Sequence, residues 1–232
     1  MNIIDVMKNK LKLKSIDGTI LGIFGGIAVS LGGLGSAIVC AELNSVNIGL
    51  SKFIGAVIFP VGIVMIMCMR FELFTSNVLT VSCIDKEHKI SNVGIFLSKI
   101  WTANFIGAII VAYVSVKCGV LSDNAIDYVN GIAQTKSQMN IVPMFIKAIF
   151  CNILVCIATT MGIKRNPLFA WIPVGLFVVC GFEHSIANMF YFMCNVFSST
   201  ISVYGIFVNL SVVTLGNIVG GVIVSKLFRY LE

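Results

Sequence analysis

The sequence F-E-L-F-T-S-N at residues 71–77 recurs with changes as F-E-H-S-I-A-N at residues 182–188. Each copy follows a P-V-G tripeptide, at residues 60–62 and 173–175, and both lie inside long apolar runs. Carboxylate, imidazole and amide groups are costly on a lipid-facing helix. Non-helical backbone persists at membrane depth only where protein or a water-filled cavity surrounds it. The two copies therefore predict two broken helices that face protein or a pore.

The composition is that of an integral membrane protein. Of 232 residues, 58% are apolar and only 11% are charged, and the mean hydropathy is +1.00. A soluble domain of this size could not cover its surface with so few charges. Because a spanning helix needs about 20 apolar residues, we expect one transmembrane domain over residues 1–232. Its six apolar runs lie at residues 19–40, 53–84, 93–116, 142–162, 168–198 and 206–228.

A second pair of matching segments extends the repeat. The stretch N-F-I-G-A-I-I-V at residues 104–111 matches N-I-V-G-G-V-I-V at residues 217–224, at a similar distance after each F-E motif. We therefore expect two three-helix units, residues 19–117 and 142–229. An odd number of spans turns the second unit upside down, as in transporters with a site near the bilayer midplane. The predicted fold is an all-α integral membrane protein of six transmembrane helices in an inverted 3+3 repeat, with the second and fifth helices broken.

Basic residues concentrate on one side of the predicted spans. The positive-inside rule places that side, the segment 1–18 and both termini in the cytoplasm of a multi-pass cell-membrane protein. The first apolar run is longer than a signal peptide's core, so we expect it to be a retained helix. The net charge of +6 lies in short loops beside the spans, which favours anionic lipid headgroups over nucleic acid as partners. The inner basic residues are Lys8, Lys10, Lys12, Lys14, Lys86, Lys89, Lys164, Arg165, Lys226 and Arg229, against Lys52, Lys117 and Lys136 outside.

We expect no cofactor, no metal and no enzymatic activity. The eight cysteines lie mostly in apolar runs without a C-x-x-C pair, and there cysteine behaves as a small apolar residue. A membrane enzyme would need a catalytic dyad or a metal cluster at depth. A receptor or scaffold without transport is the alternative of a different class, but it would not need two matched polar breaks.

His184 and Thr75 are the candidate residues of the pathway. A lone buried histidine is often only a structural hydrogen-bond donor. In a broken helix, however, its imidazole can pass a proton to a weak-acid anion or hydrogen-bond it. Thr75 is the counterpart in the first copy and a candidate hydroxyl donor, although threonine can also bond back to its own helix.

Four further residues of the two copies have expected structural roles. Glu72 and Glu183 are expected to hold the loops together through backbone N–H groups. Asn77 and Asn188 are expected to cap the half-helices that follow. Lys147, inside the fourth apolar run, either snorkels to the outer interface or attracts anions and neutralises Glu183.

The two copies, the methionine that follows the second, and the string C-N-I-L-V-C at residues 151–156 resemble the formate/nitrite transporter family. The resemblance covers nearly the whole chain. It implies an aquaporin-like fold and a homopentamer in which each protomer has its own pore for small monovalent anions.

The resemblance also implies roles for particular residues. His184 and Thr75 match the family's central pair, and Asn152 and Asn188 match polar residues near its central chamber. The outer vestibule lysine would be Lys136. An apolar slit excludes water, so a bare anion pays a large desolvation cost there, and lysines at the mouth raise the local anion concentration. The slits match Phe59, Ile63, Leu73 and Phe177.

Substrate choice is less determined. The strings around Lys147 and at residues 213–217 look more like nitrite channels than formate channels. The loop reads T-S-N where many members of the family have T-G-N or T-G-H. We expect a channel or transporter for nitrite or formate, with possible proton exchange at His184, and a hydrosulfide channel of the same family is the alternative.

Overall fold

The computed structural model describes residues 2–85, 87–199 and 202–231, and within these ranges the fold is entirely helical. Five segments are long and apolar enough to cross a membrane, at Ser15–Asn44, Ile48–Met69, Ile90–Lys117, Ile141–Lys164 and Val203–Tyr230. The remaining apolar segment, Pro167–Val179, is shorter. These findings confirm the all-helical membrane fold at this coarser level.

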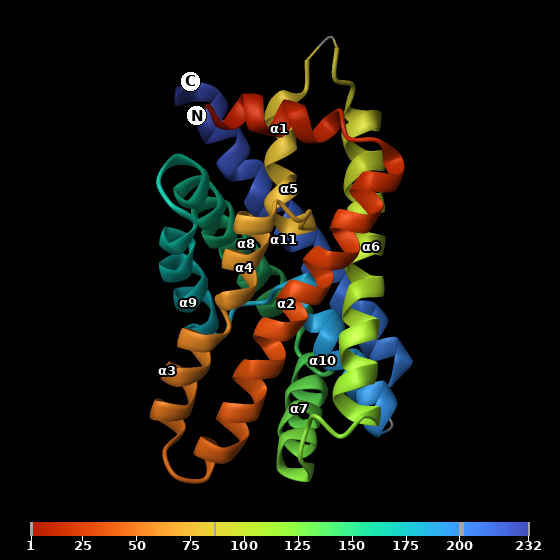
Figure 1. The fold of residues 1–232 in the computed structure, drawn as a ribbon, viewed down its shortest axis with the longest axis vertical. Helices are drawn as coiled ribbons and strands as arrows, with labels where there is room; N and C mark the ends of the chain where they lie inside the picture. Colours follow the sequence, from red (N-terminus) through yellow and green to blue (C-terminus); the bar gives the residue numbers. More distant parts are fainter. Residues whose placement is uncertain (1, 86, 200–201, 232) are drawn as a thin grey trace.

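The described elements follow one another along the chain with short connections (Figure 1). The N-terminal part comprises α1 (Ile3–Leu11), α2 (Ser15–Asn44), α3 (Ile48–Ile58), α4 (Val61–Met69), α5 (Phe74–Asn77), the 3₁₀ helix η1 (Val78–Cys83) and α6 (Ile90–Lys117). The C-terminal part comprises α7 (Asp123–Ser137), α8 (Ile141–Lys164), the 3₁₀ helix η2 (Pro167–Ala170), α9 (Trp171–Val179), α10 (Ser185–Ser198) and α11 (Val203–Leu231).

Two long helix pairs, α2 with α6 and α8 with α11, form the frame of the bundle. Glycines allow the close approach in both pairs. A Cβ on Gly107 of α6 would collide with the carbonyl oxygen of Ile23 in α2, and a Cβ on Gly220 of α11 would collide with that of Ile149 in α8. Small residues at such contacts are typical of membrane helices, because lipid offers no hydrophobic drive for helix association.

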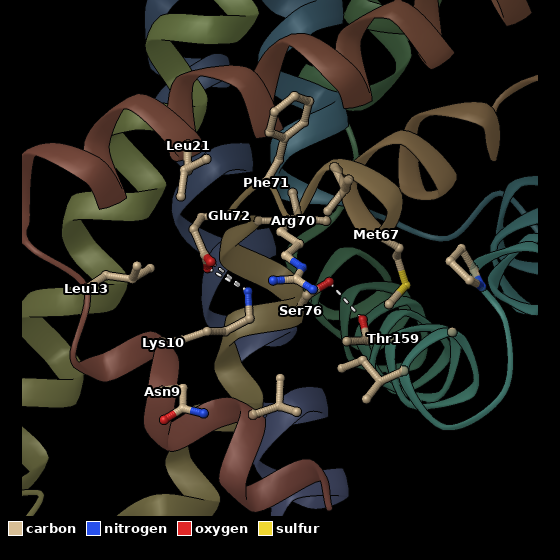
Figure 2. A pocket seen from close by; sticks show the side chains of 16 residues that line it. Asn9, Lys10, Leu13, Leu21, Met67, Arg70, Phe71, Glu72, Ser76 and Thr159 are labelled. Atoms are coloured by element: carbon tan, nitrogen blue, oxygen red, sulfur yellow. Dashed lines mark hydrogen bonds and ion pairs between the residues drawn. The ribbon is translucent and has the colours of Figure 1, made fainter. Parts of the chain in front are cut away.

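Helix α1 lies across the end of the bundle where both termini are found (Figure 1). Its Ile3 and Met7 are fully buried in a cluster with Leu79 of η1 and Cys156 of α8. Lys10 points from α1 into the bundle toward the first F-E copy (Figure 2). At the opposite end, the stretch after α6 forms the polar helix α7, which buries one face against α10 and α2.

Both F-E copies interrupt the helical path. Helix α4 ends at Met69, its C-cap Arg70 has a left-handed φ of 57°, and helical structure resumes at α5. After α9 the chain turns at Gly181 with φ +63°, and helical structure resumes at α10. The extended residues between these helix ends hold the acidic and aromatic residues of the two copies within the bundle.

The contact of α2 with α6 provides a test of the frame. We expect Gly107→Ala to lower the melting temperature in detergent clearly, because overpacking costs about 1–3 kcal/mol and the obstruction here is backbone. Gly94→Ala, in the same helix with nothing within 4 Å of its Cβ, should be neutral or stabilising. Equal melting temperatures for the two variants would show that the frame is wrong.

Candidate functional site: two helix breaks and the passage between them

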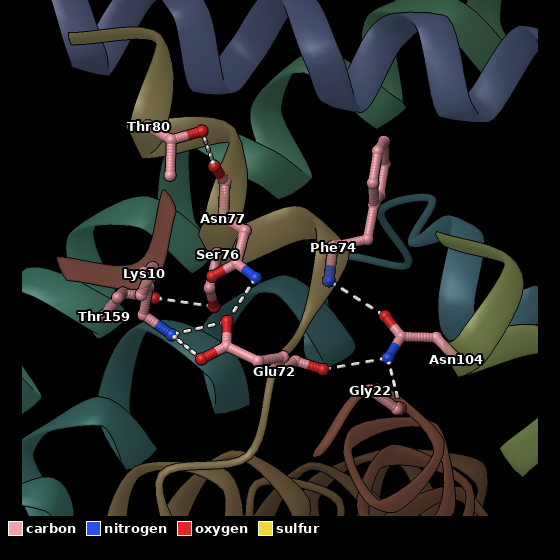
Figure 3. Close-up of polar contacts among 9 residues, drawn as sticks. All are labelled: Lys10, Gly22, Glu72, Phe74, Ser76, Asn77, Thr80, Asn104 and Thr159. Atoms are coloured by element: carbon pink, nitrogen blue, oxygen red, sulfur yellow. Dashed lines mark hydrogen bonds and ion pairs between the residues drawn. The ribbon is translucent and has the colours of Figure 1, made fainter. Parts of the chain in front are cut away.

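Asn104 of α6 holds the first break together by satisfying the backbone on both sides of it (Figure 3). Its Oδ1 accepts from the backbone N–H of Phe74 at 2.9 Å. Its Nδ2 donates to the carbonyl oxygens of Glu72 at 2.9 Å and Gly22 at 2.6 Å. One buried amide side chain thus joins α2, α6 and the start of α5, and it pairs the Phe74 N–H and the Glu72 carbonyl at the break.

Asn217 of α11 does the same at the second break. Its Oδ1 accepts from the backbone N–H of Ser185 at 2.9 Å. Its Nδ2 donates to the carbonyl oxygens of Glu183 at 2.9 Å and Ala148 at 2.8 Å. The hydrogen bonds match those of Asn104 group for group. The matching N-x-x-G strings around residues 104 and 217 were the signal for these two residues, although their role was not predicted.

The first carboxylate is neutralised from α1. Lys10 Nζ lies 2.8 Å from both oxygens of Glu72, which is 3% exposed. Asn77 Nδ2 donates to Glu72 Oε2 at 2.6 Å (Figure 3). The expectation that Glu72 binds backbone N–H groups is therefore wrong. Lys10 was not expected in the site, because the sequence shows it only as one of four lysines before the first span.

The second carboxylate has the same two kinds of partner. Lys136 Nζ, from α7, lies 2.7 Å from Glu183 Oε1, and Asn188 Nδ2 donates to Glu183 Oε2 at 2.7 Å. Lys136 therefore neutralises Glu183, a role that had been suggested for Lys147. The expectation that Glu183 binds backbone N–H groups is wrong here too.

The predicted caps are also wrong. Asn77 ends α5 and occupies the N-cap position of η1, but its side chain makes no cap hydrogen bond there. Asn188 lies inside the first turn of α10. The N-cap of α10 is His184, whose Nδ1 accepts from the backbone N–H of Ala187 at 3.1 Å. A histidine cap went unpredicted because serine, threonine, asparagine and aspartate are the usual choices.

The cap determines which nitrogen of His184 carries the proton. Because Nδ1 accepts from Ala187, the neutral imidazole must carry its proton on Nε2. Nε2 lies 2.9 Å from the hydroxyl oxygen of Thr75, so it donates to that oxygen. The Thr75 hydroxyl hydrogen is then available to another acceptor. His184 and Thr75, 109 positions apart, meet with both side chains buried.

A narrow apolar passage adjoins this pair. It has a volume of about 20 Å³, room for about one water molecule. The rings of Phe59 and Phe177 meet edge to face at 5.8 Å, and Phe177 stacks on the imidazole of His184 at 5.7 Å. The lining includes all four residues expected at the slits, Phe59, Ile63, Leu73 and Phe177, together with Val155, Val174 and His184.

A cavity adjoins the passage on each side. The terminal cavity, about 580 Å³, lies beside α1 and is lined by Lys10, Arg70, Glu72, Leu73, Ser76 and Thr159 among others. The distal cavity, about 410 Å³, is lined by Lys52, Lys136, Lys147, Phe177, His184 and Asn188 among others. Leu73 is common to the passage and the terminal cavity, and His184 is common to the passage and the distal cavity.

Asn152 and Asn188 occupy different positions relative to the cavities. Asn188 lines the distal cavity and also donates to Asn209 Oδ1 of α11 at 2.9 Å. Asn152 donates from α8 to the backbone carbonyl of Asn217 in α11 at 2.6 Å, and it is absent from the lining of the three cavities described above. The structure therefore shows Asn152 in a contact between helices α8 and α11 and Asn188 in the lining of the distal cavity.

An apolar constriction with one polar side chain, His184, between two cavities that bear basic residues, defines a membrane transport protein. The profile of the Formate/nitrite transporter family matches residues 1–231. The chain belongs to this family, whose members are channels and transporters rather than enzymes.

Relatives and solved structures agree with this membership. The formate channel BtFdhC of Bacillus thuringiensis is 33% identical over 87% of this chain and 81% of its own length. The transporter YrhG of Bacillus subtilis is 31% identical over 98% and 89%. A pentameric formate channel with formate bound has a TM-score of 0.83 at 27% identity, covering 94% of this chain and 96% of its own. An FNT family ion channel has a TM-score of 0.89 at 24% identity, covering 98% and 95%, which shows the shared fold.

The Asn104 contacts predict a large effect of a small change. Asn104→Leu should lower stability by about 2–4 kcal/mol, because each buried backbone group left unpaired costs about 1–3 kcal/mol. Thermal unfolding in detergent measures the loss. Asn92→Leu removes an exposed amide from the same helix and should leave the melting temperature unchanged. A melting temperature for Asn104→Leu equal to that of Asn92→Leu would contradict the role of Asn104.

Proposed function

We propose that this chain is a channel that passes small monovalent weak-acid anions, formate or nitrite, across the cell membrane. The observation that carries the proposal is the apolar passage between two cavities lined by basic residues. His184 lines this passage and contacts Thr75. A pathway for water or sugars would need neither basic residues in both cavities nor an apolar constriction with a single polar side chain.

The apolar passage selects against bare charge. An anion loses its hydration between Phe59, Leu73 and Phe177, at a cost that apolar walls cannot offset. The hydroxyl of Thr75 is the compensating group, because it accepts from His184 and can donate its own hydrogen to the anion. Bonds in such a chain strengthen one another. A weak acid also has the option of taking a proton and crossing the narrowest part as the neutral acid.

The cavities favour the approach of anions without trapping them. Lys10 and Lys136 are each bound to a buried glutamate, so the local field of each ion pair is moderate. In the distal cavity, Lys52 and Lys147 add positive charge beyond the Lys136–Glu183 pair. Positive potential over a cleft raises the local concentration of small anions, which raises the rate at which anions reach the passage.

The proposed architecture is an inverted 3+3 repeat of six spans, with α3, α4 and α5 as the first broken helix and α9 and α10 as the second. The matching bonds of Asn104 and Asn217 support it. The asymmetry of basic residues supports cytoplasmic termini. The similarity to a pentameric formate channel and the exposed apolar side chains of the outer helix faces support a homopentamer in lipid.

The substrate can be decided by a competitive flux panel. Purified protein in liposomes should take up formate and nitrite at acidic and neutral pH, and each should slow the uptake of the other. The relatives named as a formate channel and a nitrite transporter, the latter 29% identical in Salmonella typhimurium, motivate the choice. Preferred uptake of hydrosulfide would replace both substrates with the alternative, and no uptake of any of the three would refute the channel.

The Thr75–His184 pair makes a second prediction within this function. Thr75→Val should reduce weak-acid anion flux about tenfold or more, because a hydrogen bond to a charged group is worth about 1.5–3 kcal/mol. His184→Asn keeps a residue that caps helices well and should cause a similar loss. Because the two groups act as one unit, the double variant should be little worse than either single variant.

The conservative variant Thr75→Ser provides the matched control. It keeps the hydroxyl and should keep most of the flux. If Thr75 acted only through its shape, Thr75→Val should keep more flux than Thr75→Ser, because valine is closer to threonine in shape. Stopped-flow uptake into liposomes measures all four variants. Flux in Thr75→Val equal to that of the unmodified protein would exclude the proposed hydrogen-bond role.

A further inference from the structure

Arg70 has an unusual backbone conformation for its residue type. Its φ is 57° and its ψ is 35°, and among the described residues it is the only one other than glycine with a positive φ. The position is also repeated. Arg70 directly precedes the first F-E copy, and Gly181 directly precedes the second with φ +63°. The same left-handed turn thus ends α4 with an arginine and α9 with a glycine.

Gly181 adopts this left-handed conformation without strain, whereas Arg70 is strained in it. In the left-handed region the Cβ of an L-residue crowds the following carbonyl oxygen, and glycine avoids that cost. Space does not explain the difference, since a Cβ on Gly181 would meet nothing within 4 Å. A side chain held in a strained conformation is a reason to look for a function at that residue.

Arg70 decides the charge of the terminal cavity. The charged residues of its lining are Lys10, Arg70 and Glu72. Lys10 contacts both oxygens of Glu72 at 2.8 Å, so this pair is neutral as a unit. Arg70 then supplies the one net positive charge of the cavity. The distal cavity has Lys52 and Lys147 in addition to its own ion pair, and so does not need an arginine at the position of Gly181.

The surroundings of Arg70 suit a small planar anion. Figure 2 shows its guanidinium projecting into the terminal cavity, in this view between the Lys10–Glu72 pair and the Ser76–Thr159 pair. Thr159 donates its one hydroxyl hydrogen to the carbonyl oxygen of Val155 at 2.9 Å, so Ser76, whose Oγ lies 2.8 Å from Thr159 Oγ1, donates to Thr159. Leu73, in the same lining, also lines the apolar passage. The planar fork of arginine matches the two oxygens of a carboxylate, which a lysine cannot reproduce.

We propose that Arg70 is an anion-holding residue: its guanidinium binds the two oxygens of the permeating formate or nitrite in the terminal cavity before the ion enters the passage. The proposal rests on the proposed function. The chain keeps a strained arginine before the first F-E copy because the terminal cavity would otherwise have no net charge to hold an anion at the passage.

Sided flux measurements on four variants test the proposal. In liposomes with one orientation of the protein, Arg70→Gly and Arg70→Ala should raise the half-saturating formate concentration from the terminal face about tenfold, as expected for a lost charge-assisted hydrogen bond. The value from the distal face should stay the same. The half-saturating concentration of Arg70→Lys should lie between those of Arg70→Gly and the unmodified protein. Added salt should narrow the difference in half-saturating concentration between Arg70→Gly and the unmodified protein.

The same variants separate charge from strain. Arg70→Gly relieves the left-handed strain and should raise the melting temperature, whereas Arg70→Ala keeps the strain and should not. Arg165→Ala is the matched control, because Arg165 is an exposed arginine at the end of α8 on the same side and lies outside the cavity lining. It should leave both half-saturation values unchanged.

A direct binding measurement keeps this proposal distinct from the channel itself. Phenylglyoxal should modify Arg70 in the unmodified protein, and sodium formate should protect Arg70 but not Arg165, as read by mass spectrometry. Protection without any flux would support the Arg70 site and refute the channel. Flux with no protection, and with unchanged terminal-face half-saturation in Arg70→Gly, would refute the role of Arg70 and leave the channel standing.

Discussion

The structure depends on one constraint, that backbone groups freed where a buried helical path is interrupted must be satisfied from within the protein. Asn104 and Asn217 meet it, each with one side chain that binds a backbone N–H and two backbone carbonyls across three segments. Because these amides fix both breaks, the residues of each copy cannot shift along the bundle. The meeting of Thr75 with His184 follows from that fixed register.

The charges are arranged around the same breaks. Each copy brings a glutamate into the interior, and a lysine from a helix outside the copy, Lys10 of α1 or Lys136 of α7, neutralises it. An asparagine five positions after each glutamate donates to its Oε2 atom. The buried carboxylates therefore do not repel an approaching anion. The passage itself has apolar walls and one polar side chain, that of His184, which contacts Thr75 behind the lining. Under the proposed function, such a constriction favours a species that can lose its charge by taking up a proton.

Much of this arrangement could be predicted from the sequence, because it lies in local repeats. The two copies located the interruptions of the helical path. The four slit residues, which the resemblance to the family and not the repeat implied, all line the passage. The errors concern groups that find partners only in three dimensions. Lys10 lies 62 positions from Glu72, on a helix whose burial depends on η1 and α8. The caps assigned to Asn77 and Asn188 failed because the neighbouring glutamates are better partners for their amides than the helix ends. Asn152 matched a polar position of the family, yet here its amide joins α8 to α11.

Nitrogen-15 NMR of His184 in lipid bilayers tests most directly whether the Thr75–His184 pair receives the anion. The variant His88→Gln leaves one histidine signal, since the chain has two histidines. The contacts predict an unprotonated Nδ1 and a protonated Nε2, with an Nε2 resonance that shifts when formate is added and no longer does so after Thr75→Val. A proton on Nδ1, or a spectrum indifferent to formate at concentrations that saturate flux, would contradict the account.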